Sequence, residues 1–419
     1  MTKSVLVLSC LLIAQSEKAV PSDISSKVRK LVRQLDDNTL EKRDSAEKEL
    51  VELGTAVLNH LPRVTARTPA EVKVRLGRIV KVLETKAVES FTKQTQVTLH
   101  GTMTLRKALE AIQEQTGNKF VGLEGRNPSI QCAFENTPYW EAIDSLLDQS
   151  NHTSDPYGGS ENALFIIETE PNAGPRAKNA VYSGLFRIEP TQLDARRNLR
   201  NPDFASLQLR LDVSWEPRIT PIVVAQDLST LEAVDEDGVS LLAEDASGNY
   251  GAQGRADTST IEIDLPLQLP KRAVTKIAQV EGSLDVTLPG RIETFEFQDL
   301  ENVEDTKLQK AGTHVTLEQI RKNGDVYEIR VLLKFDDSNN ALETHRSWIN
   351  NNEALIIGAN GQRVDNLGFQ LTKQDVNEVG MGYLFDIEDD LSDCKFIYRT
   401  PALIVKMSIP YKLTDIDLP

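Results

Sequence analysis

Side chains able to do chemistry are few and scattered in this chain. Its 419 residues include 5 histidines and 3 cysteines, and they contain no G-x-S-x-G, H-E-x-x-H, paired C-x-x-C or G-x-x-x-x-G-K-[ST] motif. The most interesting cluster is His345, Arg346 and Trp348, close in sequence to Asp336 and Asp337. It could bind an anionic or sugar ligand, but a loop between strands, with Trp348 filling a sheet edge, is the favoured interpretation. The sequence therefore predicts a chain that is not an enzyme and holds no cofactor.

Three acidic runs offer the hard oxygen ligands that calcium prefers. None of them follows the pattern D-x-[DN]-x-[DN]-G with a closing Glu, so solvated turns are favoured over calcium sites. The runs cover residues 235–238, 336–339 and 386–390.

The first sixteen residues have the order of an export signal. Lys3 supplies a positive charge, residues 5–14 form an apolar run, and Ala14 and Ser16 place small residues at the −3 and −1 positions of a cleavage site. A helix of that length rises only about 15 Å, too little to cross a bilayer. We expect cleavage after Ser16 and a periplasmic or secreted mature chain without a transmembrane segment. A lipoprotein anchored through Cys10 is the alternative.

The composition is that of a folded protein with an acidic surface. Hydrophobic residues make up 40%, charged residues 26%, and the formal net charge is −16, which argues against disorder and against a nucleic-acid-binding surface. Aromatic residues are only 5%, a small supply of rings on which sugars could stack. Cys132 and Cys394 are expected to be two separate, buried small side chains rather than a disulfide.

Residues 23–91 show the periodicity of helices. Apolar residues at helical spacing indicate a first helix and then a second helix that ends at Gly54. Thr68-Pro69-Ala70-Glu71 is the start signal of a third helix. The apolar positions at helical spacing are Val28, Leu31, Val32 and Leu35, then Leu40, Ala46, Leu50 and Leu53, then Val72, Leu76, Ile79, Val80 and Leu83.

This segment carries a first resemblance. The pattern Arg43-x-x-Ala46-x-x-x-Leu50-x-x-Leu53-Gly54, followed by Pro69-x-Glu71-Val72-x-x-Arg75, resembles HEAT-type helical repeats. The resemblance implies a small helical cap or docking module rather than a long solenoid. Arg75, Arg78 and Lys81 line part of the polar side of the last helix; a solvated face is favoured there over a docking face for an acidic partner.

Residues 94–169 contain an internal duplication. The strand Val97–Leu99 leads into a helix from Leu105, and Ile130–Phe134 leads in the same way into a helix from Tyr139, with Thr104 and Pro138 at the two helix starts. Added strands at 119–123 and 163–168 give the order βαββαβ, with 150–160 as a surface loop and 170–178 as a linker.

The duplicated segments, VTLHGTMTLRKALEAIQEQTG and IQCAFENTPYWEAIDSLL, resemble the short N-terminal domain of secretins and TonB-dependent receptors. In those families the domain is a periplasmic protein-interaction unit without catalysis of its own. The resemblance therefore implies a binding module. Neither a barrel nor a secretin region follows it, so transport is not implied.

The remainder alternates apolar and polar residues at the period of strands. Residues 207–215 and 261–267 show this alternation, and 327–335 resemble 207–215. Each half is expected to close with a strand pair, at 284–300 and 403–418. The spacing predicts two tandem β-sandwiches, Ig-like in size, at 180–300 and 306–419.

Together these patterns predict a multidomain α+β chain. It has an N-terminal helical cap, a small βαββαβ domain and two C-terminal antiparallel β-sandwiches, the module order of uncharacterised exported envelope proteins. We predict a non-enzymatic periplasmic or envelope protein that acts through protein–protein contacts, at the exposed sheet edge of the small domain and the sandwich loops. The alternative is a carbohydrate- or cell-wall-binding protein that uses exposed aromatic residues of the sandwiches, for which Trp348 and Tyr250 are candidates and the inward Trp215 is not.

Overall fold

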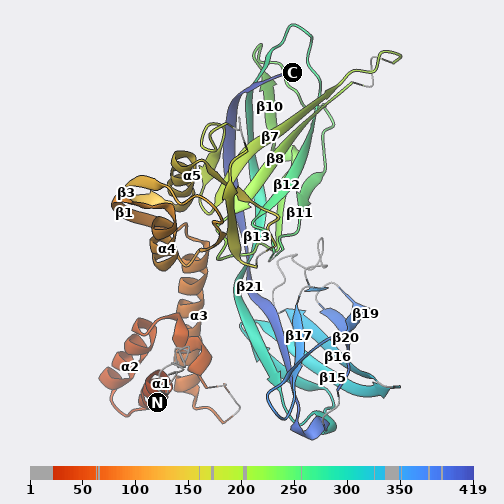
Figure 1. Cartoon of the computed structure of the whole chain (residues 1–419). Helices are drawn as coiled ribbons and strands as arrows, with labels where there is room; N and C mark the ends of the chain where they lie inside the picture. Colours follow the sequence, from red (N-terminus) through yellow and green to blue (C-terminus); the bar gives the residue numbers. More distant parts are fainter. Residues whose placement is uncertain are drawn as a thin grey trace, which may run out of the picture. The chain divides into compact units, whose positions relative to one another are not determined.

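The chain combines helices and sheets, and strands predominate (Figure 1). The computed structural model describes residues 22–62, 64, 67–159, 161–170, 174–201, 205–255, 257–324, 326–335, 349–350, 352–375, 378–387 and 390–419. It divides into two compact units, residues 1–87 and 88–419. No helix of the described ranges is long and apolar enough to cross a membrane.

The first unit is helical, as the periodicity predicts. Its elements are α1 (Ser22–Gln34), α2 (Leu40–Glu52), the 3-10 helix η1 (Thr55–His60) and α3 (Ala70–Thr92), which continues into the second unit. The predicted stripes form one core, to which Val28, Leu50 and Ile79 each contribute a fully buried side chain. Leu40 is an exception, since it lies exposed at the start of α2.

Arg75 and Arg78 form an ionic network with Glu47, in which Arg75 is buried, whereas Arg78 and Lys81 are exposed to solvent as the favoured interpretation predicts. Arg75 is buried on α3 and donates to Glu47 of α2 at 2.5 Å and to Glu71 at 2.7 Å. Arg78 reaches both oxygens of Glu47 at 2.9 Å. Burial alone would raise the pKa of Glu47, but these two guanidinium groups outweigh it and lower that pKa. The network joins α2 to α3, which helical periodicity alone cannot indicate.

The second unit begins with the duplicated strand–helix segments. Two small sheets form here, an antiparallel pair of β1 with β3 and a three-stranded sheet in the order β2-β5-β4. The elements are β1 (Gln96–Thr104), α4 (Leu105–Thr116), β2 (Lys119–Gly122), β3 (Ser129–Pro138), α5 (Tyr139–Ser150), β4 (His152–Asp155) and β5 (Ala163–Glu168). We call residues 94–169 the small domain. Strand β4 lies where the sequence predicts a loop, because pairing with β5 holds this polar segment extended.

Three larger sheets form the rest of the unit. The four-stranded sheet has the order β12-β8-β7-β6, the five-stranded sheet β14-β15-β16-β20-β19, and the seven-stranded sheet β11-β9-β13-β21-β17-β18 with β10 on β13. The first comprises β6 (Val181–Ser183), β7 (Phe186–Arg196), β8 (Ser206–Trp215) and β12 (Thr260–Leu267); the second β14 (Thr306–Lys310), β15 (Thr313–Asn323), β16 (Val326–Phe335), β19 (Gly368–Gln374) and β20 (Glu378–Phe385); the third β9 (Val223–Asp227), β10 (Glu232–Asp235), β11 (Asn249–Ala252), β13 (Lys276–Phe297), β17 (Glu353–Ile357), β18 (Arg363–Asp365) and β21 (Lys395–Asp417).

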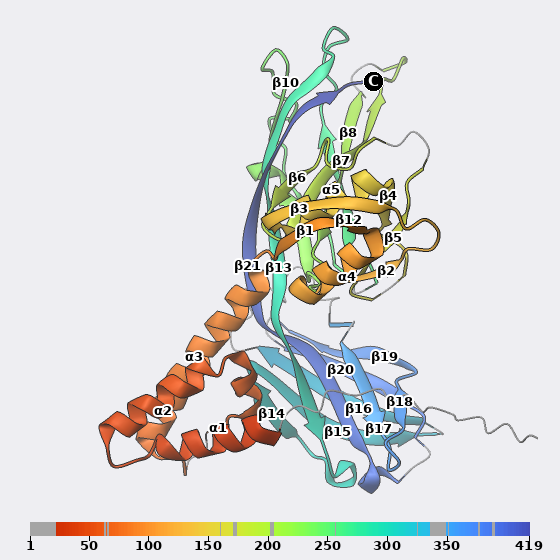
Figure 2. The ribbon, with the colours of Figure 1, turned by 60° about the vertical axis from the view of Figure 1, so that its left-hand side comes forward.

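The two longest strands, β13 and β21, pair with each other in one constant register, from Lys276 opposite Asp417 to Phe297 opposite Phe396. They run side by side through both large cores (Figures 1 and 2). The first core lies between the four-stranded and seven-stranded sheets, and the second lies between the five-stranded and seven-stranded sheets.

Each of these strands gives side chains to both cores. β13 contributes Leu284 to the first core and Phe295 to the second, while β21 contributes Phe396 to the second and Ile409 to the first. Both cores therefore share these two strands, and each core contains residues from before 300 and from after 306. The strand pairs predicted at 284–300 and 403–418 are single strands that pair with one another. Local turn signals such as Pro289-Gly290 cannot reveal this, because a partner more than 100 residues away decides it.

The cysteines lie apart, as predicted. Cys132 belongs to the core of the small domain and Cys394 to the second large core, both side chains are buried, and no disulfide joins them.

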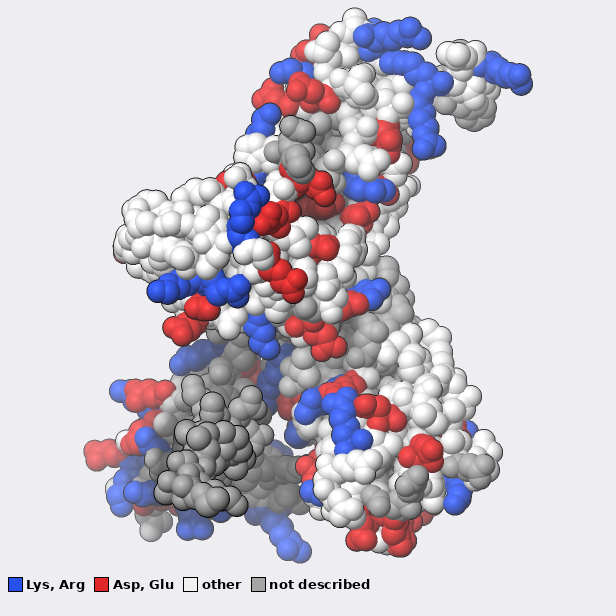
Figure 3. All heavy atoms as spheres, viewed as in Figure 1, with Lys and Arg blue, Asp and Glu red and all other residues white. Residues whose placement is uncertain are grey.

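Charge on the second unit is uneven. In Figure 3 acidic and basic side chains intermingle over its middle, whereas Lys and Arg gather at the end reached by the β7–β8 hairpin.

The shared strands predict that the two large cores unfold together. Ile409→Ala leaves a cavity in the first core and should cost about 3 kcal/mol of unfolding free energy. Because the same strand carries Phe396 of the second core, hydrogen exchange should accelerate in peptides of β16 as well as of β8. Ile292→Ala, at an exposed position of β13, is the matched control and should change stability by no more than about 0.5 kcal/mol. Faster exchange confined to the first core would contradict this prediction.

Candidate binding surface

The predicted site residues lie outside the part of the chain that the structure describes. This holds for the export signal with Cys10, Ala14 and Ser16, and for His345, Arg346 and Trp348. Within the described ranges, no group of three or more His, Cys, Asp or Glu side chains could hold a metal ion.

Of the three predicted acidic runs, only residues 235–238 are described in full, and the first carboxylate of this run already accepts hydrogen bonds. Asp235 is buried and accepts hydrogen bonds from the backbone N–H groups of Asp237 at 3.0 Å and Val239 at 2.9 Å. This is a turn held by a side chain, as the favoured interpretation predicts, but the Asp235 carboxylate is buried rather than solvated. Residues 336–339, 388 and 389 of the other two runs are not described.

The duplication in the small domain extends to its hydrogen bonds. The first N–H of α4, on Leu105, donates to the carbonyl of Pro128 just before β3, and the first N–H of α5, on Tyr139, donates to the carbonyl of Thr95 just before β1, each at 3.0 Å. The two strand–helix units are therefore equivalent in geometry as well as in sequence. Each helix start is held by the residue that precedes the other unit's strand.

A pair of equivalent glutamines partly closes the edges of the β1–β3 ribbon. Gln115 of α4 accepts from the N–H of Thr98 at 3.0 Å and donates to its carbonyl at 3.1 Å. Gln149 of α5 accepts from the N–H of Gln131 at 3.3 Å. An incoming strand would have to displace these amides, so the ribbon is a poorer strand acceptor than the sequence predicts.

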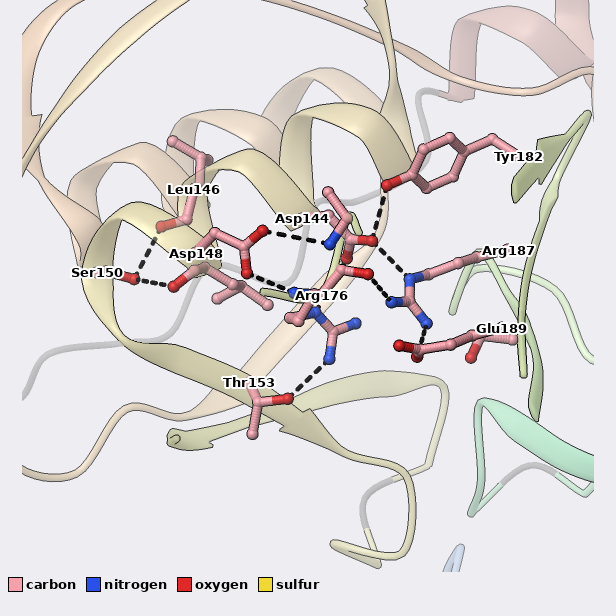
Figure 4. A network of polar contacts seen from close by, with 12 residues as sticks. Asp144, Leu146, Asp148, Ser150, Thr153, Arg176, Tyr182, Arg187 and Glu189 are labelled. Atoms are coloured by element: carbon pink, nitrogen blue, oxygen red, sulfur yellow. Dashed lines mark hydrogen bonds and ion pairs between the residues drawn. The ribbon is translucent and has the colours of Figure 1, made fainter. Parts of the chain in front are cut away.

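A buried ionic network fixes the small domain to the four-stranded sheet (Figure 4). Asp144 of α5 is fully buried and accepts from Arg176 at 2.9 Å and from Arg187 of β7 at 2.6 Å. The Tyr182 hydroxyl donates to the same carboxylate at 2.9 Å. On the same helix the indole N–H of Trp140 donates to the carbonyl of Leu185 at 3.0 Å.

Arg176 gives the segment after the small domain a structural role. Its guanidinium also donates to Thr153, and its backbone N–H donates to Asp148, each at 2.8 Å. The described part of the predicted linker is therefore tied to the domain.

The electrostatics of this network follow from its burial. Burial alone would lower the pKa of Arg187, but attraction to Asp144 and Glu189 outweighs it and raises that pKa. Burial, and then the charge of Asp144, raise the pKa of Tyr182. Arg187 therefore stays charged and Tyr182 stays protonated at neutral pH, and both groups act as hydrogen-bond donors that hold the network together.

A second buried carboxylate fixes the other side of the domain. Glu216, just after β8, accepts from the N–H of Thr95 at 2.7 Å, from Asn118 at 3.2 Å and from Arg218 at 2.8 Å. Arg218 also donates to the carbonyl of Lys93 at 2.6 Å. With two anchors of this kind, the small domain and the sheet behind it form one body.

The most unusual exposed surface lies on β19, an edge strand of the five-stranded sheet, and on Leu367, the residue just before it. Leu367 and Leu371 are 66% and 52% exposed, and Phe369 between them is 44% exposed. Phe369 pairs with Tyr383 of β20, which is only 1% exposed. The core therefore ends between β20 and β19. We call Leu367, Phe369 and Leu371 the edge stripe.

The outer side of β19 pairs with no other strand in the described ranges. Natural edge strands usually carry charges or proline that prevent pairing with other chains. Residues 367–372 (LGFQLT) carry neither, and the lysine of this strand, Lys373, lies after a register shift and is paired with Glu378 at 2.6 Å. The alternation in this segment looks like any half-buried strand. Among the described residues its exposure depends on where the facing sheet ends, and the local sequence does not encode that.

A pocket of about 590 Å³ lies where the two large cores meet. Its walls include the apolar side chains of Ile222 and Ile292 and the prolines Pro289 and Pro401. Two of its cations are already engaged, since Arg218 bonds Glu216 and Arg399 bonds Glu353, each at 2.8 Å, and its third cation is Lys119. It gathers no nucleophile with a base.

The fold and these surfaces define a chain of helices and sheets, mostly strands, with an uncovered apolar edge. Comparison with models of protein families, with curated proteins and with solved structures finds no match for this chain.

The Asp144 network predicts a large cost for a small change. Asp144→Asn keeps the shape but removes the charge that two guanidinium groups share, and should lower the unfolding free energy by about 3–5 kcal/mol. Denaturant unfolding followed by tryptophan fluorescence measures it, since Trp140 lies on the same helix. The control is Asp365→Asn, which removes an exposed ion pair with Arg363 and should cost less than about 1 kcal/mol. Equal losses in the two variants would show that burial does not govern the network.

Proposed function

We propose that this chain is a non-enzymatic, exported envelope protein whose role is to bind another protein. In this proposal α1–α3 are a HEAT-like helical module, the small domain is of the secretin/TonB short type, and two Ig-like sandwiches follow. The export signal predicted at residues 1–16 supports the compartment. The edge stripe on β19 is the observation that carries the binding role.

The edge stripe favours strand addition as the mode of binding. A strand added beside β19 would pair with its open backbone, and every second side chain of the newcomer would extend the apolar face made by Leu367, Phe369 and Leu371. The backbone hydrogen bonds to β19 need no particular side chains in the added strand. The exposed ring and methyl groups of the edge stripe, however, select apolar residues at alternate positions of that strand. The partner is thus a protein with an extended segment of alternating apolar and polar residues.

Charge argues against a second copy of the chain as the partner. With a net charge of −16, two copies repel each other at low salt. A segment that is neutral or basic meets no such penalty.

Placing a charge on the edge stripe tests the proposal. Leu371→Lys introduces the kind of residue that protects natural edge strands, and should abolish capture of the partner while leaving the unfolding free energy within about 0.5 kcal/mol of wild type. A photo-crosslinking residue at Thr372 captures the partner from an envelope extract. Peptides from the captured protein are then titrated against the purified chain by fluorescence anisotropy.

The matched control is Ile292→Lys, which also adds a lysine at an exposed isoleucine but away from the edge of any sheet. It should bind like wild type. If Leu371→Lys captures the same peptides with equal affinity, strand addition at β19 is wrong. If only a dimer of the chain crosslinks, the partner is a second copy and the proposed role fails.

The carbohydrate alternative finds no matching support among the described aromatic side chains. Trp140 and Trp215 are both buried, and Tyr250 stands alone at an exposed position of β11. Flat sugar sites use several exposed rings, so protein binding is the proposal that the described surface favours.

A further inference from the structure

Five cationic side chains gather at one end of the first core. Arg196, Arg197 and Arg200 lie at the end of the β7–β8 hairpin, and Lys271 and Arg272 lie in the loop that joins β12 to β13. All five are exposed. Among them projects Leu199, which at 87% is the most exposed large apolar side chain of the described chain. We call these six residues the basic tip.

Backbone geometry places the two loops together. β12 pairs with β8 as far as Leu267 opposite Leu207, so the chain leaves both strands at the same end of the sheet. The Arg197 guanidinium then donates to the carbonyl of Pro270 at 2.9 Å. The N–H groups of Arg200 and Asn201 both donate to the side chain of Asn198, which holds the turn around Leu199. The basic tip is therefore a formed surface (Figure 3).

None of the five cations makes an ion pair with a described carboxylate, whereas Arg187, Arg210 and Arg218 of the same region each do. Residues 91–419 hold 31 basic and 51 acidic residues, so five cations without a described acidic partner are unusual in this body. Such a surface attracts an anionic partner.

We propose that the basic tip binds the surface of an anionic lipid membrane, an interaction beyond the binding of a protein partner at β19. Arginine guanidinium groups match lipid phosphates in geometry and charge. Leu199, in the middle of the group, can enter the boundary between headgroups and acyl chains while the arginines remain at the phosphates.

The leucine distinguishes a membrane from other polyanions. A nucleic acid or an anionic polysaccharide would use the cations but offers no apolar layer to a leucine side chain. Base stacking would call for aromatic residues, and the six residues that define the basic tip include none. An apolar residue at the apex with cations around it is the arrangement that a lipid surface fits.

Vesicle sedimentation of the full chain tests this proposal. The probes are vesicles of equal parts phosphatidylcholine and phosphatidylglycerol, and vesicles of phosphatidylcholine alone. We expect binding only to the anionic vesicles, weakening as salt is raised. The variant R196Q/R200Q/R272Q should lower the partition coefficient about a hundredfold, because each of the three cations contributes a similar share of the attraction to the anionic lipid surface. Leu199→Ala should lower it about tenfold by removing buried methyl groups.

The matched control, K334Q/R363Q/K395Q, removes the same net charge from the surface around the second core, at residues that already form ion pairs with glutamates. It should bind vesicles within about threefold of wild type, because distant charges are screened. Absence of binding to anionic vesicles, or equal losses in both triple variants, overturns the proposal. Retention on heparin or DNA that depends on the basic tip, without vesicle binding or an effect of Leu199→Ala, also overturns it and identifies a soluble polyanion instead.

Discussion

The pairing of β13 with β21 is the constraint on which the rest of the second unit depends. Two strands of 22 and 23 residues keep one register through both cores, so neither core is complete without a strand from the other half of the sequence. A slip by one residue would turn every buried side chain of a strand to the opposite face. A slip of β13 would take Leu284 and Phe295 out of their cores together, and a slip of β21 would do the same to Phe396 and Ile409. The register is therefore held from both ends.

Buried ion pairs hold the small domain against the four-stranded sheet, just as strand pairing holds the larger sheets together. Asp144 and Glu216 are each fully buried and each meets its cations and hydrogen-bond donors from a different segment. A buried carboxylate without such partners is costly, so separating the domain from the sheet would expose two unsatisfied sites together. The small domain is consequently a fixed part of the second unit. The side of the domain formed by α5 already contacts the four-stranded sheet.

Much of the local structure could be predicted from the sequence, while the long-range pairing could not. Period-two alternation located β8 and β16, and the repeat at Leu105 and Tyr139 located two equivalent helices. The pairing of β13 with β21 is invisible to such patterns, because Pro289-Gly290 resembles a turn unless the distant partner strand is known. The Asp144 network was missed for a similar reason: a lone Asp on a helix and an Arg in a polar segment carry no sign that they meet. The edge stripe was missed because its alternation is that of an ordinary strand.

The edge of the five-stranded sheet extends beyond the second core. The seven-stranded sheet serves both cores, and the strands that give side chains to the second core are β9, β13, β17 and β21. Among the described residues, burial changes from nearly complete at Tyr383 of β20 to partial at Phe369 of β19 within a single strand spacing. Apolar side chains are therefore exposed at this edge, and a binding partner is the physical means by which they would be covered.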